Sequence, residues 1–390
     1  MNLQFNLTKR IMKKLVFFIT MISITFSLFA QNDKIKEKKL SFEFSGFVNL
    51  NAIIDFNGLD DYNDFTTSQI PINPSPYDKA YHLHATAEQT RLNMGVNYKT
   101  PWGNLRGFVS GDFTSGVETY LHMREAYLEV GSFLFGQTNT TFGYSDIVPA
   151  TIDFEGPNSS TTLRNPMIRY KHELKKGVIY SIALENRGTD RKPFFDKNGN
   201  PIDKSFNTMP ALIVNVNKKG KLGVISLSGM INNTRYFNAD SNEFHDISYG
   251  GAFSAIINTS KQNHFNLFFI AGKGVSNFIN DLSGNGYNGV PDISTDRLVL
   301  LNSIGGFVSY TQFWSQKLSS NFIFSYIQLE KSKLLDKEDF HHSSYALANL
   351  FYSPFNRLNF GVEYIWGELF VQDNQNGNAN RLQFLAQFSF

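Results

Sequence analysis

The sequence contains no cysteine, and this absence excludes disulfide bonds, thiol catalysis and cysteine-bound metals. It also lacks the GxSxG, HExxH and GxxxxGKS motifs of hydrolases, zinc peptidases and phosphate-binding loops. His82 and His84 face the same way on one predicted strand, but no third metal ligand has suitable spacing. His341 and His342 lie in a predicted loop beside serines and have no placed acid. We therefore predict no enzymatic activity, no bound metal and no cofactor.

The chain also has no large excess of positive or negative charge. The formal net charge is +2, but residues 1–30 carry Lys9, Arg10, Lys13 and Lys14 and no acid. Removing these four positive charges leaves about −2 for the rest of the chain. A chain without a basic field does not suggest nucleic-acid binding.

Long apolar runs are absent after the N-terminus. Lys13 and Lys14 precede an apolar run over residues 15–30, which is typical of a secretory signal peptide cut before Gln31. Ser and Thr interrupt this run, which is shorter than the roughly 20 residues of a membrane-spanning helix. We predict a signal peptide over residues 1–30, with Met12 as a second candidate start, and a short charged periplasmic tether over 31–40.

Aromatic residues, in contrast, are abundant. Phe and Tyr number 38 and 17, aromatics make up 15% of the chain, and yet the mean hydropathy is −0.25. From residue 41 onward apolar and polar residues alternate with a period of two, as in strands that have one apolar and one polar face. The alternation is clearest in residues 42–55, 91–99, 357–366 and 381–390. These predicted strands span roughly 10 to 16 residues, longer than the 5 or 6 typical of soluble sheets.

The connections between the strands alternate between short and long. Tight turns are predicted near residues 100–104, 130–132, 175–177, 218–220, 260–263, 314–316 and 353–356. Between them lie connections at about 57–82, 115–118, 138–163, 188–207, 237–245, 275–295, 332–343 and 372–379. Eight outer loops and seven inner turns require sixteen strands. The pattern of strands and connections in residues 41–390 therefore predicts an all-β fold. This fold is a transmembrane antiparallel β-barrel with short periplasmic turns and long outer loops.

Other features of the chain fit the same location. The last residue, Phe390, is an outward-facing aromatic, typical of barrels handed to the outer-membrane assembly machinery. An open sheet edge is not tolerated in lipid, so the first strand must pair with the sixteenth. We predict a protein of the bacterial outer membrane whose partners are the lipid bilayer and this machinery.

A long loop rich in Thr, Ser, Asn, Gly and Pro over about 138–163 is predicted to fold inward and narrow the lumen. Charged side chains at a narrow point select solutes. The candidates for a solute-selective constriction are Arg91, Arg106, Arg124, Arg164 and Arg169. Neither face of the strand around Arg124 is cleanly apolar, which suggests burial under the loop or against another subunit. For each arginine the alternative is a solvated charge in the lumen or at the base of a loop.

The segment from Arg91 to Tyr170 resembles the DcaP-like family of trimeric outer-membrane porins. The resemblance rests on RLNMGVNYKT, LRGFVSGDF, HMREAYLEVGSFLFGQTNTTF, PATIDFEGP and NPMIRY, in this order. It covers the first quarter of the barrel specifically. It implies a homotrimer and the diffusion of small anionic solutes, dicarboxylates among them, through an arginine-lined eyelet. Arg91, Arg124 and Arg169 match the basic positions of the family, and Arg164 lies next to its motif.

One departure from the family pattern lies at the N-terminus, because ten charged residues cannot form the long coiled coil that some members carry. A trimer would then rest on the barrel walls, where the region 116–136 has the least regular apolar pattern. We predict a porin for small hydrophilic, anionic solutes. The alternatives are an outer-membrane adhesin or surface-binding protein, for which long loops suffice, and a barrel enzyme such as a phospholipase.

Overall fold

The computed structural model describes residues 40–390 except 60, 77–79, 101–102, 115–119, 189, 196–199, 203–204, 208, 239 and 241. The predicted signal peptide and nearly all of the predicted tether lie outside the described residues. Residues 42–390 form one compact unit. Within the described part of the chain, no helix has both the length and the apolar character needed to cross a membrane.

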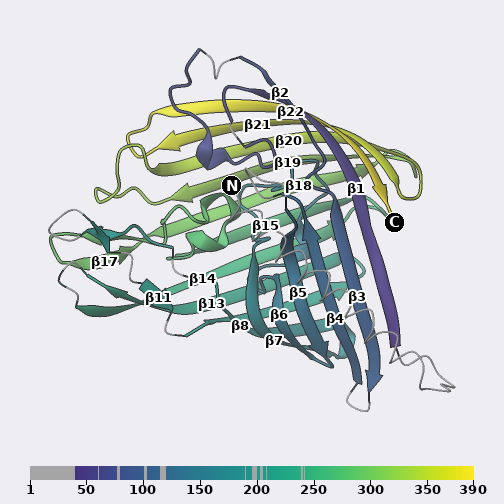
Figure 1. The fold of residues 1–390 in the computed structure, drawn as a ribbon, viewed down its shortest axis with the longest axis horizontal. Helices are drawn as coiled ribbons and strands as arrows, with labels where there is room; N and C mark the ends of the chain where they lie inside the picture. Colours follow the sequence, from purple (N-terminus) through teal and green to yellow (C-terminus); the bar gives the residue numbers. More distant parts are fainter. Residues whose placement is uncertain are drawn as a thin grey trace, which may run out of the picture. The chain divides into compact units, whose positions relative to one another are not determined.

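Sixteen antiparallel strands form a closed barrel wall, which confirms the predicted fold (Figure 1). They are β1 (Leu40–Phe56), β3 (Arg91–Thr100), β4 (Gly103–Asp112), β5 (His122–Val130), β6 (Phe133–Asn139), β7 (Arg164–Leu174), β8 (Val178–Glu185), β12 (Ala211–Gly220), β13 (Gly223–Phe237), β14 (Glu243–Asn258), β15 (His264–Lys273), β18 (Asn302–Phe313), β19 (Leu318–Leu329), β20 (Phe340–Phe355), β21 (Leu358–Val371) and β22 (Asn376–Ser389). Each strand pairs with the next, and β1 pairs with β22 from Phe47↔Ser389 to Phe56↔Asn380. Closure leaves no edge whose backbone groups would face lipid unpaired.

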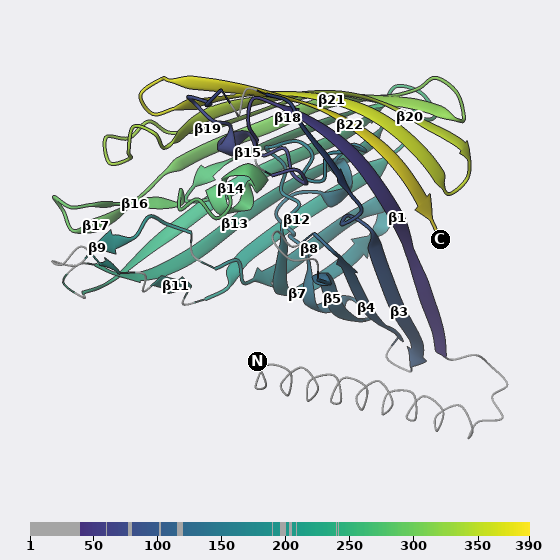
Figure 2. The same ribbon diagram turned by 45° about the horizontal axis from the view of Figure 1, so that its top comes forward.

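Shorter strands extend the wall or belong to the outer loops. β2 (His82–Thr86) pairs with the far half of β1, so that β2 and β3 together occupy one position in the wall. β11 (Ser205–Asn207) extends the position of β12 beside β13. The hairpins β9 (Phe194–Phe195) with β10 (Pro201–Ile202) and β16 (Gly289–Asp292) with β17 (Arg297–Leu300) lie in loops at one end of the wall (Figure 2).

The two faces of the wall differ as the alternation predicts. On β1, Phe42, Phe44, Val48 and Leu50 are exposed on the outer face, whereas Asn49, Asn51 and Asp55 are buried on the inner face. Arg381 of β22 donates to both carboxylate oxygens of Asp55 at 2.5 and 3.1 Å across the closing seam. The charge of this buried carboxylate is therefore compensated within the barrel wall.

Much of the barrel interior is an apolar core, which the sequence reading did not predict. Three outer loops enter the barrel: the first (described residues 57–59, 61–76 and 80–81), the third (140–163) and the sixth (274–301). Phe65, Phe142 and Phe278 from these loops are almost completely buried together with inner residues of β12 to β21. The rings of Phe142 and Phe278 meet edge to face at 5.3 Å. The apolar core therefore lies on the side of β12 to β21, away from β3 to β7.

Candidate functional site

The site begins with a pair of arginines that share one carboxylate. Arg91 at the start of β3 and Arg124 on β5 donate to the same oxygen of Asp112, at 2.8 and 2.7 Å. The Asp112 side chain is fully buried at the end of β4, so both guanidinium groups are held by charge-assisted hydrogen bonds. Two positive charges and one negative charge leave this triad with a net charge of +1.

Arg124 occupies a β-bulge. Ser110 of β4 pairs with Glu125, but the next residue, Gly111, pairs with Met123, so Arg124 is the extra residue on β5. A bulge changes which residues face inward, and this explains why neither face of the strand reads as cleanly apolar. The Gln137 amide of β6 donates to the Arg124 carbonyl at 3.1 Å and holds the bulge in place.

The third outer loop covers these two arginines. The ring of Phe154 lies 5.7 Å from Arg91 Cζ and 4.7 Å from Arg124 Cζ, within the range of cation–π contacts. Glu363 of β21, on the opposite wall, accepts hydrogen bonds from the backbone N–H groups of Ile152 and Asp153, at 2.9 and 2.7 Å. The loop therefore bridges the lumen from the arginines to the far wall.

Carboxylates face the arginines from the loops. Glu155 accepts a hydrogen bond from Thr66 at 3.1 Å, and Asp153 accepts one from Tyr345 at 2.9 Å. Asp281 of the sixth outer loop accepts hydrogen bonds from the Thr67 hydroxyl and from the Ser68 N–H. These bonds fix the acidic side of the site to three different loops and the far wall.

Burial and mutual repulsion keep these loop carboxyls protonated to higher pH than usual. Burial, with the nearby charges of Asp61 and Asp153, raises the pKa of Asp64 to about 7. Burial raises the pKa of Asp153 to about 6 and that of Asp281 to about 7. The pKa of Glu155 is raised well above its ordinary value by burial and by Asp281, Asp64 and Asp153. Near neutral pH, this side of the site therefore carries only part of its formal negative charge.

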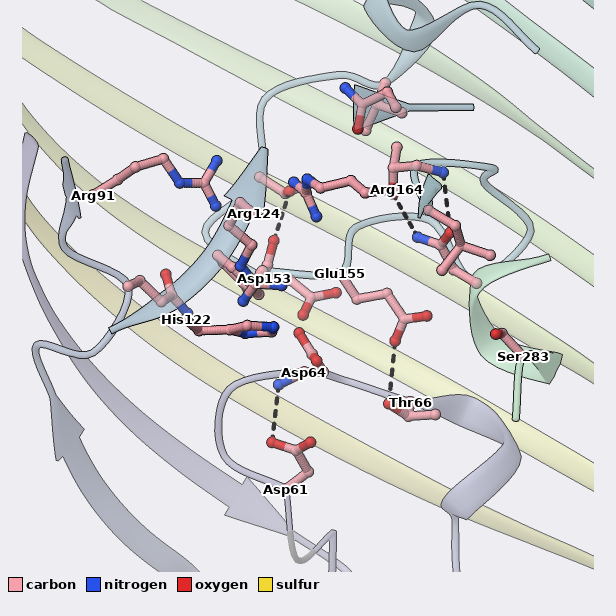
Figure 3. Close-up of a pocket in the computed structure, with 18 of the residues that line it drawn as sticks. Asp61, Asp64, Thr66, Arg91, His122, Arg124, Asp153, Glu155, Arg164 and Ser283 are labelled. Carbon is pink, nitrogen blue, oxygen red and sulfur yellow. Dashed lines mark hydrogen bonds between the residues drawn. The ribbon is translucent and has the colours of Figure 1, made fainter. Parts of the chain in front are cut away.

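Between the two sides lies a cavity of about 700 Å³. Figure 3 shows Arg91, Arg124 and Arg164 along one side and Asp64, Asp153 and Glu155 on the other. The lining also includes uncharged polar residues, Thr162, Asn280, Ser283 and Asn285 among them. The site is therefore a polar passage with basic and acidic sides.

Two lining arginines lack a carboxylate partner within the described residues. Arg164, at the start of β7, forms no salt bridge there, and its buried Nε has no hydrogen-bond acceptor. Arg187 follows β8 and donates to three neutral acceptors: the Asn277 carbonyl at 2.8 Å, the Asn165 side chain at 3.3 Å and the Ser283 hydroxyl. Neither guanidinium group forms a salt bridge among the described residues, and the charges of Asp190 and Glu185 act on Arg187 from a greater distance.

The remaining two predicted arginines do not line this cavity. Arg106 of β4 lies nearer the periplasmic turns, where it donates to Glu43 at 3.1 Å and to the Tyr127 hydroxyl at 2.9 Å. Arg169 of β7 lies opposite Leu134 and Ala183 in the sheet register. The structure thus brings Arg91, Arg124 and Arg164 together and places Arg106 and Arg169 elsewhere on the wall.

Sequence reasoning missed several lining residues. Arg187, Asp64 and Asp281 lie in three different loops, and no spacing in the chain signals that these loops meet inside the barrel. Gln89 lines the cavity because the chain leaves the wall between β2 and β3, where Gln89 accepts hydrogen bonds from Asn49 and Asn51 at 3.1 and 2.8 Å. The nearest usable signal was the DFEGP segment, which contains Asp153, Phe154 and Glu155.

The sequence matches the DcaP outer membrane protein family over residues 26–390. The chain belongs to this DcaP family. The solved outer membrane channel DcaP of Acinetobacter baumannii is similar in fold, with 20% identity and a TM-score of 0.76, over 91% of this chain and 99% of that chain. No curated protein matches the chain.

Other solved outer-membrane proteins share the fold of this DcaP family member at lower similarity. An anion-selective porin from Comamonas acidovorans has 9% identity and a TM-score of 0.57, over 90% of this chain and 100% of that chain. OmpT of Vibrio cholerae, solved in a trimer form, has 12% identity and a TM-score of 0.55, over 90% of this chain and 99% of that chain. The predicted family and the location in the outer membrane are confirmed, and these relationships support a role as an outer-membrane channel.

Proposed function

We propose that this chain is a porin through which small hydrophilic anions, such as dicarboxylates, diffuse past Arg91, Arg124, Arg164 and Arg187. The observation that carries the proposal is the balance of charge in the cavity. Guanidinium groups stay protonated at any ordinary pH, whereas the loop carboxyls that face them have raised pKa values. At pH 6 and below, where Asp64 and Asp281 are mostly protonated and Asp153 is protonated to about one half, positive charge then predominates and favours anions.

The geometry also suits passage rather than tight binding. Arg91 and Arg124 are oriented by Asp112, and Arg187 by neutral acceptors, so their charge is fixed before a solute arrives. Several weak contacts allow a solute to leave as readily as it enters. Guanidinium groups match the shape of a carboxylate and partly replace its hydration shell.

The test is the reversal potential of the purified protein in a planar bilayer across a potassium chloride gradient. We expect steady conductance with chloride more permeant than potassium at pH 6. Absence of conductance would favour the adhesin or the phospholipase, and a preference for potassium would refute the anion channel. Uptake of succinate by proteoliposomes, compared with an uncharged solute of similar size, then examines the dicarboxylate class.

We also propose that the protein is a homotrimer that associates through the outer face of β4 and β5. This face protrudes little, because Gly107 and Ala126 are small. It is apolar, because the neighbouring Val109 and Leu128 are 47% and 44% exposed. Small residues let two walls approach closely. The trimer form of Vibrio cholerae OmpT, which has a similar fold, is consistent with this assembly.

Introducing a large ring into this face is expected to break the trimer. In native gels, Ala126→Trp should convert most of the protein to monomers, because the indole would occupy the space of the neighbouring subunit. Ala348→Trp on the outer face of β20 is the matched control and should leave the assembly unchanged, since an outward Trp is tolerated in lipid. A trimer that survives Ala126→Trp would place the interface elsewhere.

A further inference from the structure

Five lysines gather on two adjacent periplasmic turns. Lys175 and Lys176 lie in the turn between β7 and β8. Lys218 and Lys219 lie at the end of β12, and Lys221 lies in the turn between β12 and β13. These five residues are called the lysine cluster below. In the register of β8 and β12, Lys218 lies opposite Val178. A Cβ added to Gly177 would be 3.0 Å from the Lys219 carbonyl oxygen, so the two turns touch.

The charge of the lysine cluster is not compensated within the described residues. All five side chains are exposed, and none is within 4.0 Å of a carboxylate oxygen in that part of the chain. The periplasmic turns at 259–263, 314–317 and 356–357 each carry a single Lys or Arg. Positive charge is therefore concentrated at one sector of the periplasmic rim.

An aromatic row marks the membrane boundary in the same sector. On the outer face, Tyr170 lies 5.0 Å from Phe133 and 6.0 Å from Tyr180, and His172 lies 5.6 Å from Tyr180. Aromatic girdles of barrels lie at the level of the lipid head groups. Tyr180 pairs with Val216, two residues from Lys218 on the same outer face. The lysine cluster therefore begins where the phospholipid head groups of the periplasmic leaflet are expected.

Exposed leucines lie among these lysines. Leu174 precedes Lys175 and is 49% exposed, and Leu222 follows Lys221 and is 79% exposed. Apolar side chains beside lysines are typical of surfaces that rest on a membrane, where the apolar group enters the head-group region. A hydrophilic anionic polymer such as murein offers no apolar phase for these leucines. The combination therefore favours lipid over murein.

We propose that the lysine cluster, together with Leu174 and Leu222, is a binding surface for anionic phospholipid head groups of the periplasmic leaflet. The phosphates accept hydrogen bonds from several ammonium groups, and the leucines contact the glycerol and upper acyl region. This surface is independent of the solute pathway. It would hold an anionic lipid of the phosphatidylglycerol type at one sector of the barrel rim.

The test compares lipid binding to the detergent-purified barrel by native mass spectrometry. Phosphatidylglycerol and phosphatidylcholine with identical acyl chains are the probes. In the variant, all five residues of the lysine cluster are replaced by Gln. We expect wild-type protein to prefer phosphatidylglycerol, and the variant to bind it at least about tenfold more weakly, because each basic side chain near an anionic surface contributes measurably. Phosphatidylcholine binding should not change.

A second five-lysine variant is the control and has the same change in net charge. It replaces exposed lysines of two other periplasmic turns and of the outer loop between β19 and β20: Lys261, Lys317, Lys331, Lys333 and Lys337. It should bind phosphatidylglycerol within twofold of wild type, and heat-modifiable migration on gels verifies that each variant is folded. Equal losses in the two variants, or wild-type affinity in the cluster variant, would overturn the proposal. The proposal would also be overturned if the cluster variant lost binding to soluble murein fragments while its binding of phosphatidylglycerol stayed at the wild-type level.

Discussion

Replacing both Arg164 and Arg187 by glutamine is expected to lower the chloride-to-potassium permeability ratio about tenfold or more. Arg91 and Arg124 share the charge of Asp112, whereas Arg164 and Arg187 have no carboxylate partner among the described residues. These two side chains therefore contribute much of the positive charge that has no salt-bridge partner. One charge in partly aqueous surroundings contributes on the order of 1 kcal/mol to the energy of a passing ion.

The control is Arg106→Gln, which removes one positive charge from the same wall outside the cavity. The reversal potential should be measured at low ionic strength, because salt screens charges separated by more than about 10 Å at 0.1 M. Conductance should persist in both variants, since neither substitution adds bulk. If Arg106→Gln shifts the ratio as much as the double variant does, selectivity is set by the whole lumen and the cavity is not the filter.

Raising the pH from 5 to 8 is expected to lower the anion preference several-fold. The pKa values of Asp153, Asp64 and Asp281 are raised to about 6, 7 and 7, so these carboxyls lose protons as the pH rises through this range. Each lost proton adds one negative charge opposite arginines that remain positive. The net charge of the cavity therefore becomes more negative, and cations pass more easily at higher pH.

Permeability ratios measured at half-unit steps of pH would locate this transition. The isosteric variant with Asp64→Asn and Asp281→Asn should keep the anion preference at pH 8 and show a much shallower dependence on pH. A wild-type ratio that is constant between pH 5 and 8 would mean that these carboxyls do not titrate in the open channel. A transition that persists in the variant would assign it to other groups.

The barrel could be predicted because its signals are local. The alternation of apolar and polar residues within a strand, for example in residues 381–390, indicates one apolar and one polar face. Tight turns indicate where the chain reverses direction. Pairing of β1 with β22 then follows from the cost of unpaired backbone groups in lipid. The family resemblance added the arginine-bearing motifs of the first quarter of the barrel, of which three arginines line the cavity.

The interior of the site was less predictable because it depends on contacts between distant loops. The hydrogen bonds from Ile152 and Asp153 to Glu363 span more than 200 residues, and no periodic pattern reports them. The bulge at Arg124 could not be predicted without knowing how β4 pairs with β5. One signal was available, since β15 reads HFNLFFIAGK and its near-continuous apolar run indicates a strand that is apolar on both its outer face and its inner face.

The apolar core inside the barrel also shapes the electric field along the proposed solute path. Phe65, Phe142, Phe278 and the inner residues of the far wall exclude water from the volume behind the acidic loops. Hydrocarbon polarises far less than water, so field lines from the arginines are concentrated in the narrow aqueous strip beside them. A solute moving along that strip experiences a stronger transverse field than it would in a water-filled lumen of the same width. Filling one side of the barrel with phenylalanine and isoleucine thus makes a few fixed charges act at greater range.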